Sequence, residues 1–154
     1  MISAPVLITD SCVLIDYAKS AKDALMMLAR EVRVVVPRIL LVEEVHDLSI
    51  NDAPTEALLE AARMPRPLSS FDWLCLILAR DNHWTCVSND KRLRAQCLSV
   101  GVRTQWSLEP LVLLVRRKKL PKERAEKIAR AMAEQNPFVG TPIIRRFISR
   151  IRNT

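Results

Sequence analysis

Glycine is nearly absent from this 154-residue chain, which contains only Gly101 and Gly140. Two glycines at that spacing cannot form the G-x-G-x-x-G loop of dinucleotide-binding folds or the G-x-x-x-x-G-K-[ST] loop that cradles nucleotide phosphates. They also cannot form a G-x-S-x-G nucleophile elbow. Dinucleotide-dependent redox enzymes, P-loop nucleotide hydrolases and elbow-type serine hydrolases are therefore poor candidates.

The chain also lacks long apolar runs and paired cysteines. No run approaches the roughly 20 residues that span a bilayer. Residues 1–5 contain no basic stretch followed by a long apolar segment, so we expect no secretory signal and no membrane association. The cysteines form no C-x-x-C pair and have no histidine at zinc-site spacing. We therefore expect buried thiols in a reducing cytoplasm for all four, which are Cys12, Cys75, Cys86 and Cys97.

Apolar residues make up 49% of the chain, enough for the core of one domain. Short apolar runs, typical of strands buried in a parallel sheet, alternate with segments of helical periodicity. This alternation predicts an α/β fold: a three-layer α/β/α sandwich with a mostly parallel central sheet, followed by C-terminal helices. The predicted strands are 6–8, 32–36, 84–88 and 102–106. The predicted helices are 12–19, 23–30, 39–48, 55–63, 73–80, 91–98, 108–118, 122–135 and 142–152, and 49–54 is predicted to be a polar connector.

Charge is divided unevenly along the chain. Residues 1–102 carry eleven Lys and Arg against thirteen Asp and Glu, whereas residues 103–154 carry thirteen against four. Clustered cations bind phosphates by releasing counterions, so the basic part favours an anionic polymer as partner. The alternative is a solvated basic helix surface. The densest basic stretch, the candidate RNA-binding group, is Arg116, Arg117, Lys118 and Lys119.

Four acidic residues stand where the carboxyl edge of a parallel sheet could gather them. Asp10 and Asp90 follow predicted strands, Glu44 (or its neighbour Glu43) lies early in a predicted helix, and Asp72 lies in the first turn of another. Each has a simpler explanation: Asp72 and Asp90 could serve only as helix caps, Asp10 as a turn residue and Glu44 as a solvated side chain.

Gathered carboxylates would repel one another strongly. At about 4 Å and an effective dielectric near 20, each pair costs roughly 4 kcal/mol. A divalent cation would balance the charge, and oxygen ligands without Cys or His favour Mg²⁺ or Mn²⁺ over zinc. Such a metal can activate water for attack on a phosphodiester.

The motifs that contain these acids resemble those of the PIN-domain ribonucleases. The segment 9–16, T-D-S-C-V-L-I-D, resembles their opening motif, and residues 36–45 resemble their strand, proline and helix with an inward glutamate. Segments 68–72 and 87–93 resemble the third and fourth acidic motifs. The four motifs occur in order over about residues 5–106. Cys12 departs from the pattern, because asparagine is frequent at that position.

The resemblance implies a VapC-type, toxin-like endoribonuclease that cleaves single-stranded RNA with Mg²⁺ or Mn²⁺. It assigns Asp10, Glu44, Asp72 and Asp90 to the catalytic and metal-binding cluster, with supporting roles for Ser11, Ser88 and Asn89. Residues 1–106 would form the catalytic core and 107–154 a basic helical extension packed on it. An antitoxin partner and a homodimer are further implications.

Two other functions remain open from the residues alone. The chain could be a catalytically inactive RNA-binding module that keeps the fold, an alternative prompted by the Cys12 departure. It could also be a phosphoacceptor signalling domain, although such domains place a pair of acids after the first strand and Ser11 follows Asp10 here.

Overall fold

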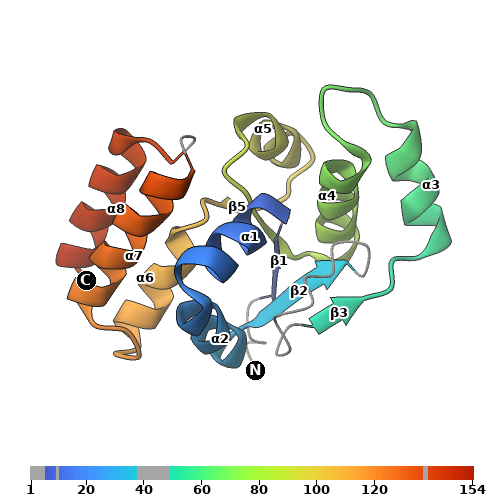
Figure 1. Ribbon diagram of the computed structural model, residues 1–154. Coiled ribbons are helices and arrows are strands. Elements are labelled where there is room, and N and C mark those ends of the chain that lie inside the picture. Colours follow the sequence, from blue (N-terminus) through green and yellow to red (C-terminus); the bar gives the residue numbers. More distant parts are fainter. Residues whose placement is uncertain (1–5, 10, 38–48, 137–138) are drawn as a thin grey trace.

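The computed structural model describes residues 6–9, 11–37, 49–136 and 139–154 of the chain. Within these ranges it contains five strands and eight helices (Figure 1). The strands are β1 (Val6–Thr9), β2 (Arg33–Pro37), β3 (Ser49–Asn51), β4 (Thr85–Val87) and β5 (Thr104–Gln105). The helices are α1 (Ser11–Ser20), α2 (Lys22–Glu31), α3 (Thr55–Arg63), α4 (Ser70–Asn82), α5 (Lys91–Ser99), α6 (Glu109–Arg116), α7 (Lys122–Gln135) and α8 (Thr141–Arg152).

The strands form one sheet in the order β3-β2-β1-β4-β5, and every ladder is parallel. β1 lies at the centre, where Ile8 faces Val35 of β2 on one side and Cys86 of β4 on the other. The predicted parallel sheet is confirmed. Its order reverses beside β1, the position at which open α/β sheets bind their ligands beyond the carboxyl ends of the strands.

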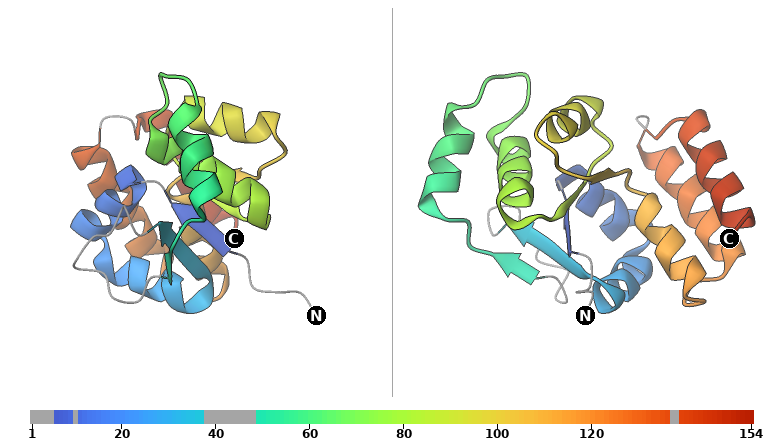
Figure 2. Two further views of the ribbon diagram at one scale, coloured as in Figure 1. Left: turned by 90° about the vertical axis from the view of Figure 1, so that its right-hand side faces the viewer. Right: turned by 180° about the vertical axis from the view of Figure 1, so that it is seen from behind.

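Alternate residues of the central strands enter two separate cores. Leu7, Val34 and Val87 pack against α1, α2 and the C-terminal helices. The neighbouring residues Ile8, Val35 and Cys86 pack on the other face, against α3, α4 and α5. Since successive side chains of a strand point to opposite faces, helices cover both sides of the sheet (Figures 1 and 2). The three-layer architecture is therefore as predicted.

The C-terminal helices share the first of these cores. Leu111, Ile128 and Ile151, from α6, α7 and α8, are fully buried and belong to the same apolar cluster as Leu7 of β1. α6 packs on α2, and α7 packs on α1. Among the described helices, none combines the length and the apolar character needed to span a membrane.

Two expectations about these elements are wrong. The polar connector predicted over 49–54 begins with β3, which pairs with the edge of β2. A three-residue strand without an apolar run gives no sequence signal, because the pairing with β2 forms it. Cys12 is exposed, whereas the other three cysteines are buried as expected, and these four described residues form no disulfide. The helix predicted over 39–48 lies outside the described residues.

Truncation of Leu111, which is 0% exposed, tests the contribution of the C-terminal helices to the core. We expect Leu111→Ala to lower the free energy of unfolding by about 2–5 kcal/mol, because it removes buried methyl groups and leaves a cavity. Leu98→Ala is the control, since Leu98 is 64% exposed, and should change stability by less than about 0.5 kcal/mol. Equal losses in urea unfolding of the two variants would contradict the burial described here.

Candidate functional site

The register of the sheet places the carboxyl ends of β1, β4 and β5 side by side. Thr9, at the end of β1, pairs with Val87 of β4, which in turn pairs with Gln105 of β5. The residues that follow β4 and β5, including Asp90 and Trp106, therefore lie at the carboxyl edge of the sheet beside the end of β1. This edge is the candidate site.

Helix α4 begins at the same edge. It leads through a short turn into β4, so it runs antiparallel to the strands and its first turn lies at their carboxyl ends. Cys75 Sγ donates a hydrogen bond to the Thr9 carbonyl oxygen at 3.6 Å, which joins this end of the helix to the end of β1. Asp72 lies one helical turn before Cys75, on the same side of the helix. The structure therefore brings Asp72 and Asp90 to one edge.

The other two predicted acids are not among the described residues. Asp10 and Glu44, together with the alternative Glu43, lie outside the described residues. Within the described ranges, no three of the His, Cys, Asp and Glu side chains gather closely enough to hold a metal ion. The four-carboxylate cluster therefore stays a prediction, with two of its members assigned to the same edge.

Asp72 takes part in a capping box. Its Oδ2 accepts hydrogen bonds from the Ser69 backbone N–H at 3.0 Å and from Ser69 Oγ at 2.9 Å, while its own N–H donates to Ser69 Oγ at 3.2 Å. The capping role expected from the sequence is present, and it fixes the carboxylate at the start of α4.

Asp90 caps helix α5. Its Oδ1 accepts a hydrogen bond from the Arg92 backbone N–H at 2.9 Å and lies 3.5 Å from Arg92 Nε. Its own N–H donates to Ser88 Oγ at 3.0 Å, and Ser88 is completely buried. Ser88 therefore holds the backbone of Asp90, and its supporting role in a catalytic site stays a prediction.

Each of the two caps uses only one oxygen of the carboxylate. Among the described residues, Asp72 Oδ1 and Asp90 Oδ2 have no hydrogen-bond partner, because the caps use only the other oxygen. Two buried oxygens at the same edge, Thr9 Oγ1 and Gln105 Oε1, also lack a partner in the described part of the chain. Buried oxygens left unpaired cost about 1–3 kcal/mol each, so this edge is suited to a ligand that supplies positive charge or donors.

Asn89, which follows β4, forms hydrogen bonds with Ser107, which follows β5. Its Nδ2 donates to Ser107 Oγ at 2.8 Å, and its Oδ1 accepts from the Ser107 N–H at 3.0 Å. This pair of bonds holds the turn that carries Asp90 against the chain beyond β5. Asn89 therefore has a positioning role, while Ser11, the third supporting residue proposed from the sequence, begins α1 at this edge.

Arg94 is a functional candidate that the sequence analysis missed. Only 9% of the residue is exposed, its Nη1 donates to the Ser88 carbonyl oxygen at 3.1 Å, and its Cζ lies 3.2 Å from the centre of the Trp106 ring. Burial lowers the pKa of Arg94, and the negative charges of Asp90 and Glu109 oppose that shift. In the sequence, Arg94 follows Leu93 and precedes Cys97 by three residues. This spacing places Arg94 on the apolar side of α5 and could have indicated that it is buried.

The predicted RNA-binding group lies at the opposite edge of the sheet. α6 begins beyond the end of β5 and runs back along the sheet, so Arg116 to Lys119 follow its far end. Arg117 Nη1 lies 2.7 Å from Glu31 Oε2, and Lys119 Nζ lies 3.8 Å from Glu31 Oε1. Glu31 ends α2, two residues before β2 begins. Two of the four cations are therefore engaged in ion pairs at the amino edge.

A pocket of about 40 Å³ opens between α6 and α8 beside Trp106. Val112 and Phe147 contribute to its apolar lining, and Arg146 and Arg150 also line it. A cavity that holds a benzene ring measures about 150 Å³, so this pocket is too small to enclose a nucleobase. We therefore assign no base-binding role to it.

Two buried side chains of α1 form hydrogen bonds with other parts of the chain. Tyr17 is 2% exposed, and its hydroxyl donates to the Ser107 carbonyl oxygen. Its neighbour Asp16 is 8% exposed and accepts a hydrogen bond from Asn136 Nδ2 at 2.7 Å. Asp16 therefore joins α1 to the end of α7.

Neither a comparison with protein-family models nor a search of curated proteins finds a match to this chain.

Tyr17 is the single tyrosine of the chain, so its alkaline titration can be followed alone. Burial, and secondarily the charge of Asp16, raise the pKa of Tyr17 far above its ordinary value. Above pH of about 10 the unfolded chain loses this proton while the folded chain keeps it. The free energy of unfolding should therefore fall with rising pH, by up to about 1.4 kcal/mol per pH unit.

Tyrosinate absorbance and urea unfolding between neutral and alkaline pH would measure both effects. Tyr17→Phe should lose the extra alkaline slope, because the group that titrates is gone. Absorbance that develops at an ordinary tyrosine pKa while the protein stays folded would contradict the burial of Tyr17.

Proposed function

We propose that this protein is a Mg²⁺- or Mn²⁺-dependent endoribonuclease of the PIN type that cleaves single-stranded RNA, the function implied by the four ordered acidic motifs. The observation that carries the proposal is the placement of Asp72 and Asp90 at the edge where β1 ends. Both belong to those motifs, and the sequence separates them by eighteen positions. The parallel three-layer fold is the architecture that the proposal requires.

Thr9, which precedes Asp10 in the sequence, contacts both elements that carry or lead to the described acids. The Thr9 carbonyl oxygen accepts the hydrogen bond from Cys75 of α4. Thr9 also pairs with Val87, three residues before Asp90. These contacts of Thr9 support a site at the end of β1 that includes Asp72 and Asp90. The motif order adds Asp10 and Glu44, which lie outside the described residues.

The donor set suits a hard divalent cation. Asp72 Oδ1 and Asp90 Oδ2 are oxygens without a partner among the described residues, and Mg²⁺ prefers oxygen ligands. When bound, the cation would supply activated water and stabilise the leaving oxygen of a phosphodiester. Ser88 and Asn89 would keep Asp90 in position through the backbone and Ser107 contacts, and Ser11 would support the start of α1.

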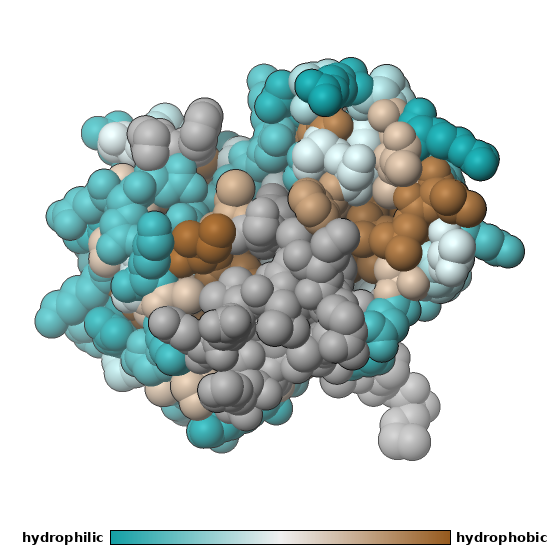
Figure 3. Space-filling model, turned by 45° about the vertical axis from the view of Figure 1, so that its right-hand side comes forward, coloured by the Kyte–Doolittle hydropathy of each residue, from teal (hydrophilic) through white to brown (hydrophobic). Residues whose placement is uncertain are grey.

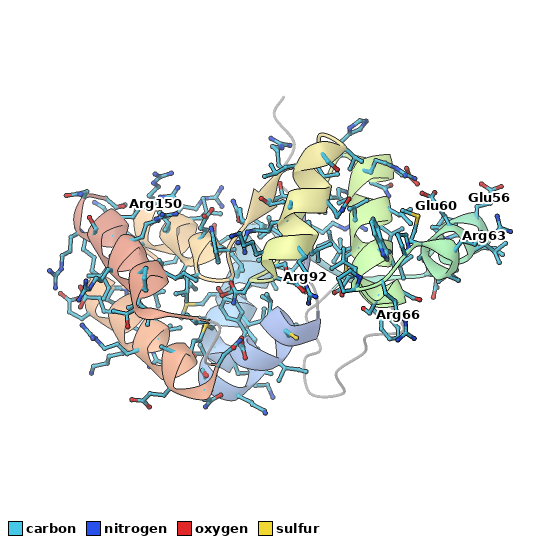
Figure 4. All side chains as sticks on the ribbon, turned by 90° about the horizontal axis from the view of Figure 1, so that it is seen from above. Glu56, Glu60, Arg63, Arg66, Arg92 and Arg150 are labelled. Carbon is cyan, nitrogen blue, oxygen red and sulfur yellow. The ribbon has the colours of Figure 1, made fainter. Side chains whose placement is uncertain are left out.

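Two exposed cations lie beside Asp90 at the start of α5. Lys91 and Arg92 are exposed and follow Asp90 directly, and Arg92 projects from α5 in the view from above (Figure 4). We assign them the contacts with RNA phosphates beside the cleavage site. The group from Arg116 to Lys119, at the amino edge, would then attract RNA only at longer range.

An inactive RNA-binding module is the second candidate. The capping bonds of Asp72 and Asp90 favour it, since both acids already have structural roles. Cys12 adds to this, because it is exposed in the first turn of α1, where the motif commonly has asparagine. The resemblance also suggests an antitoxin partner and a homodimer, and the pattern of cysteines suggests a cytoplasmic location; these remain part of the proposal.

Three matched substitutions distinguish these functions. We expect Asp72→Asn and Asp90→Asn to reduce cleavage of single-stranded RNA roughly 100-fold or more, because each removes a metal-ligand charge. Asparagine is a good N-cap at position 90, and at position 72 its amide oxygen can still accept a hydrogen bond from Ser69, so the fold should survive. Asp81→Asn is the control: this residue is on α4 like Asp72 but is exposed and pairs with Arg80 at the far end.

Chelation of divalent cations should abolish the same cleavage, and added Mn²⁺ should restore it. RNA binding without metal-dependent cleavage by the unmodified chain would instead support the inactive module. Cleavage that is unchanged in both Asn variants would exclude the assigned acids.

RNA affinity can show which cations contact the strand. We expect Arg92→Gln to weaken binding and to lower the slope of log affinity against log salt by about 0.7, the value for one phosphate contact on a single strand. Lys118→Gln, at the amino edge, should have a smaller effect. Fluorescence anisotropy with a labelled single-stranded RNA measures both, and a larger effect of Lys118→Gln would favour the basic stretch after α6.

A further inference from the structure

Most cations of this protein lie on its surface, and hydrophilic side chains cover much of the face that Figure 3 shows. Among the described Lys and Arg residues, Arg94 of α5 is the only one that is buried. A guanidinium keeps its proton throughout the physiological range, and taking a charge out of water costs free energy unless opposite charge lies nearby. The burial of Arg94 therefore needs an electrostatic explanation.

Two uncharged groups hold the guanidinium of Arg94 in place. Its Nη1 donates to the Ser88 carbonyl oxygen at 3.1 Å, and its Cζ lies 3.2 Å from the centre of the Trp106 ring. Among the described residues, no carboxylate forms an ion pair with it. The two contacts therefore orient the cation without neutralising its charge.

The acids that act on this cation lie at the candidate edge. Arg94 follows Asp90 by four residues, so the two lie one helical turn apart on the same side of α5. The Arg94 backbone N–H donates to the Asp90 carbonyl oxygen at 3.0 Å. Burial lowers the pKa of Arg94, and the negative charges of Asp90 and Glu109 oppose that shift. The buried cation therefore interacts, through the interior of the protein, with an acid of the candidate metal site.

We infer that Arg94 is a built-in counter-cation of the acidic edge, which balances part of the negative charge around Asp90 and thereby lowers the affinity of the edge for a divalent cation. The inference rests on the proposed function, since it concerns the regulation of the same site. Carboxylates gathered for a metal repel one another when no metal is bound, and a fixed positive charge beside them reduces that repulsion. The same charge repels an incoming Mg²⁺ or Mn²⁺, so metal occupancy should follow the free metal concentration.

Burial distinguishes Arg94 from its exposed neighbour Arg92, whose Nε lies 3.5 Å from Asp90 Oδ1. Salt screens exposed charges, because the Debye length falls from about 10 Å at about 0.1 M to about 3 Å at about 1 M ionic strength. A charge inside the protein is screened much less. The effect of Arg94 on metal affinity should therefore persist at high salt, whereas that of Arg92 should disappear.

Neutral substitutions at position 94 test the inference, with Mn²⁺ affinity of the full chain measured by isothermal titration calorimetry. We expect Arg94→Gln and Arg94→Met to lower the dissociation constant roughly 10-fold or more, because the repelling charge is gone. Glutamine keeps a donor for the Ser88 carbonyl, and methionine keeps an apolar contact with Trp106. Arg94→Lys keeps the charge, so its dissociation constant should stay within about two-fold of the original.

Two controls separate buried charge from charge in general. Arg92→Gln should tighten Mn²⁺ binding at about 0.1 M salt and no longer at about 1 M, whereas Arg94→Gln should keep most of its effect at both. Arg103→Gln changes an exposed cation immediately before β5, at the amino edge, and should leave the affinity unchanged. Circular dichroism would verify that each variant is folded, and the second neutral variant keeps the test valid if the first fails to fold.

The inference is overturned if the neutral variants bind Mn²⁺ as the unmodified chain does or more weakly, because a purely structural role of Arg94 predicts a loss of affinity. A gain in Arg94→Lys as large as that in the neutral variants would also exclude an effect of charge. RNA cleavage that depends on Asp72 and Asp90, combined with a Mn²⁺ affinity indifferent to Arg94, would reject this inference alone. Mn²⁺ binding by Arg94→Gln but not by the unmodified chain would support the counter-cation and reject the metal-dependent nuclease. Absence of Mn²⁺ binding in every variant would reject both.

Discussion

Parallel pairing of β1 with β4 is the constraint on which the rest of the candidate site depends. Because Thr9 faces Val87, and Val87 faces Gln105, three chain segments leave the sheet at one level. The Cys75–Thr9 contact then brings the start of α4 to the same place. A shift of this register by one residue would turn Leu7 and Ile8 to the wrong cores, so the same apolar side chains that build the two cores also align the edge.

Asp72 and Asp90 at this edge both cap helices, which is one of the two roles that the sequence presented as alternatives. Asp72 and Asp90 each cap a helix with one carboxylate oxygen and leave the other without a partner in the described part of the chain. A cap holds a carboxylate in a fixed orientation without consuming both oxygens. Capping is therefore compatible with a ligand site, and it can provide the rigidity that such a site needs.

Around these acids, the supporting contacts come from distant parts of the chain. Asn89 holds Ser107, Tyr17 donates to the backbone of the same serine, and Arg94 lies between the Ser88 carbonyl and the Trp106 ring. The segment that begins the C-terminal helices is thereby tied to the turn that carries Asp90. The C-terminal helices are thus connected to the edge through polar contacts as well as through the shared core.

Local patterns were sufficient for most of the fold and for the choice of candidate acids. The strands around Ile8, Val34 and Cys86 follow from apolar runs, and α4 follows from its capping box and continuous apolar content. These patterns involve only residues that are close together in the sequence, so the sequence alone is enough to recognise them. Tertiary structure alone decided the existence of β3, the exposure of Cys12 and the burial of Arg94 against Trp106. It also separated the Arg116–Lys119 stretch from the acidic edge, because the direction in which α6 runs back along the sheet depends on packing between residues far apart in the chain.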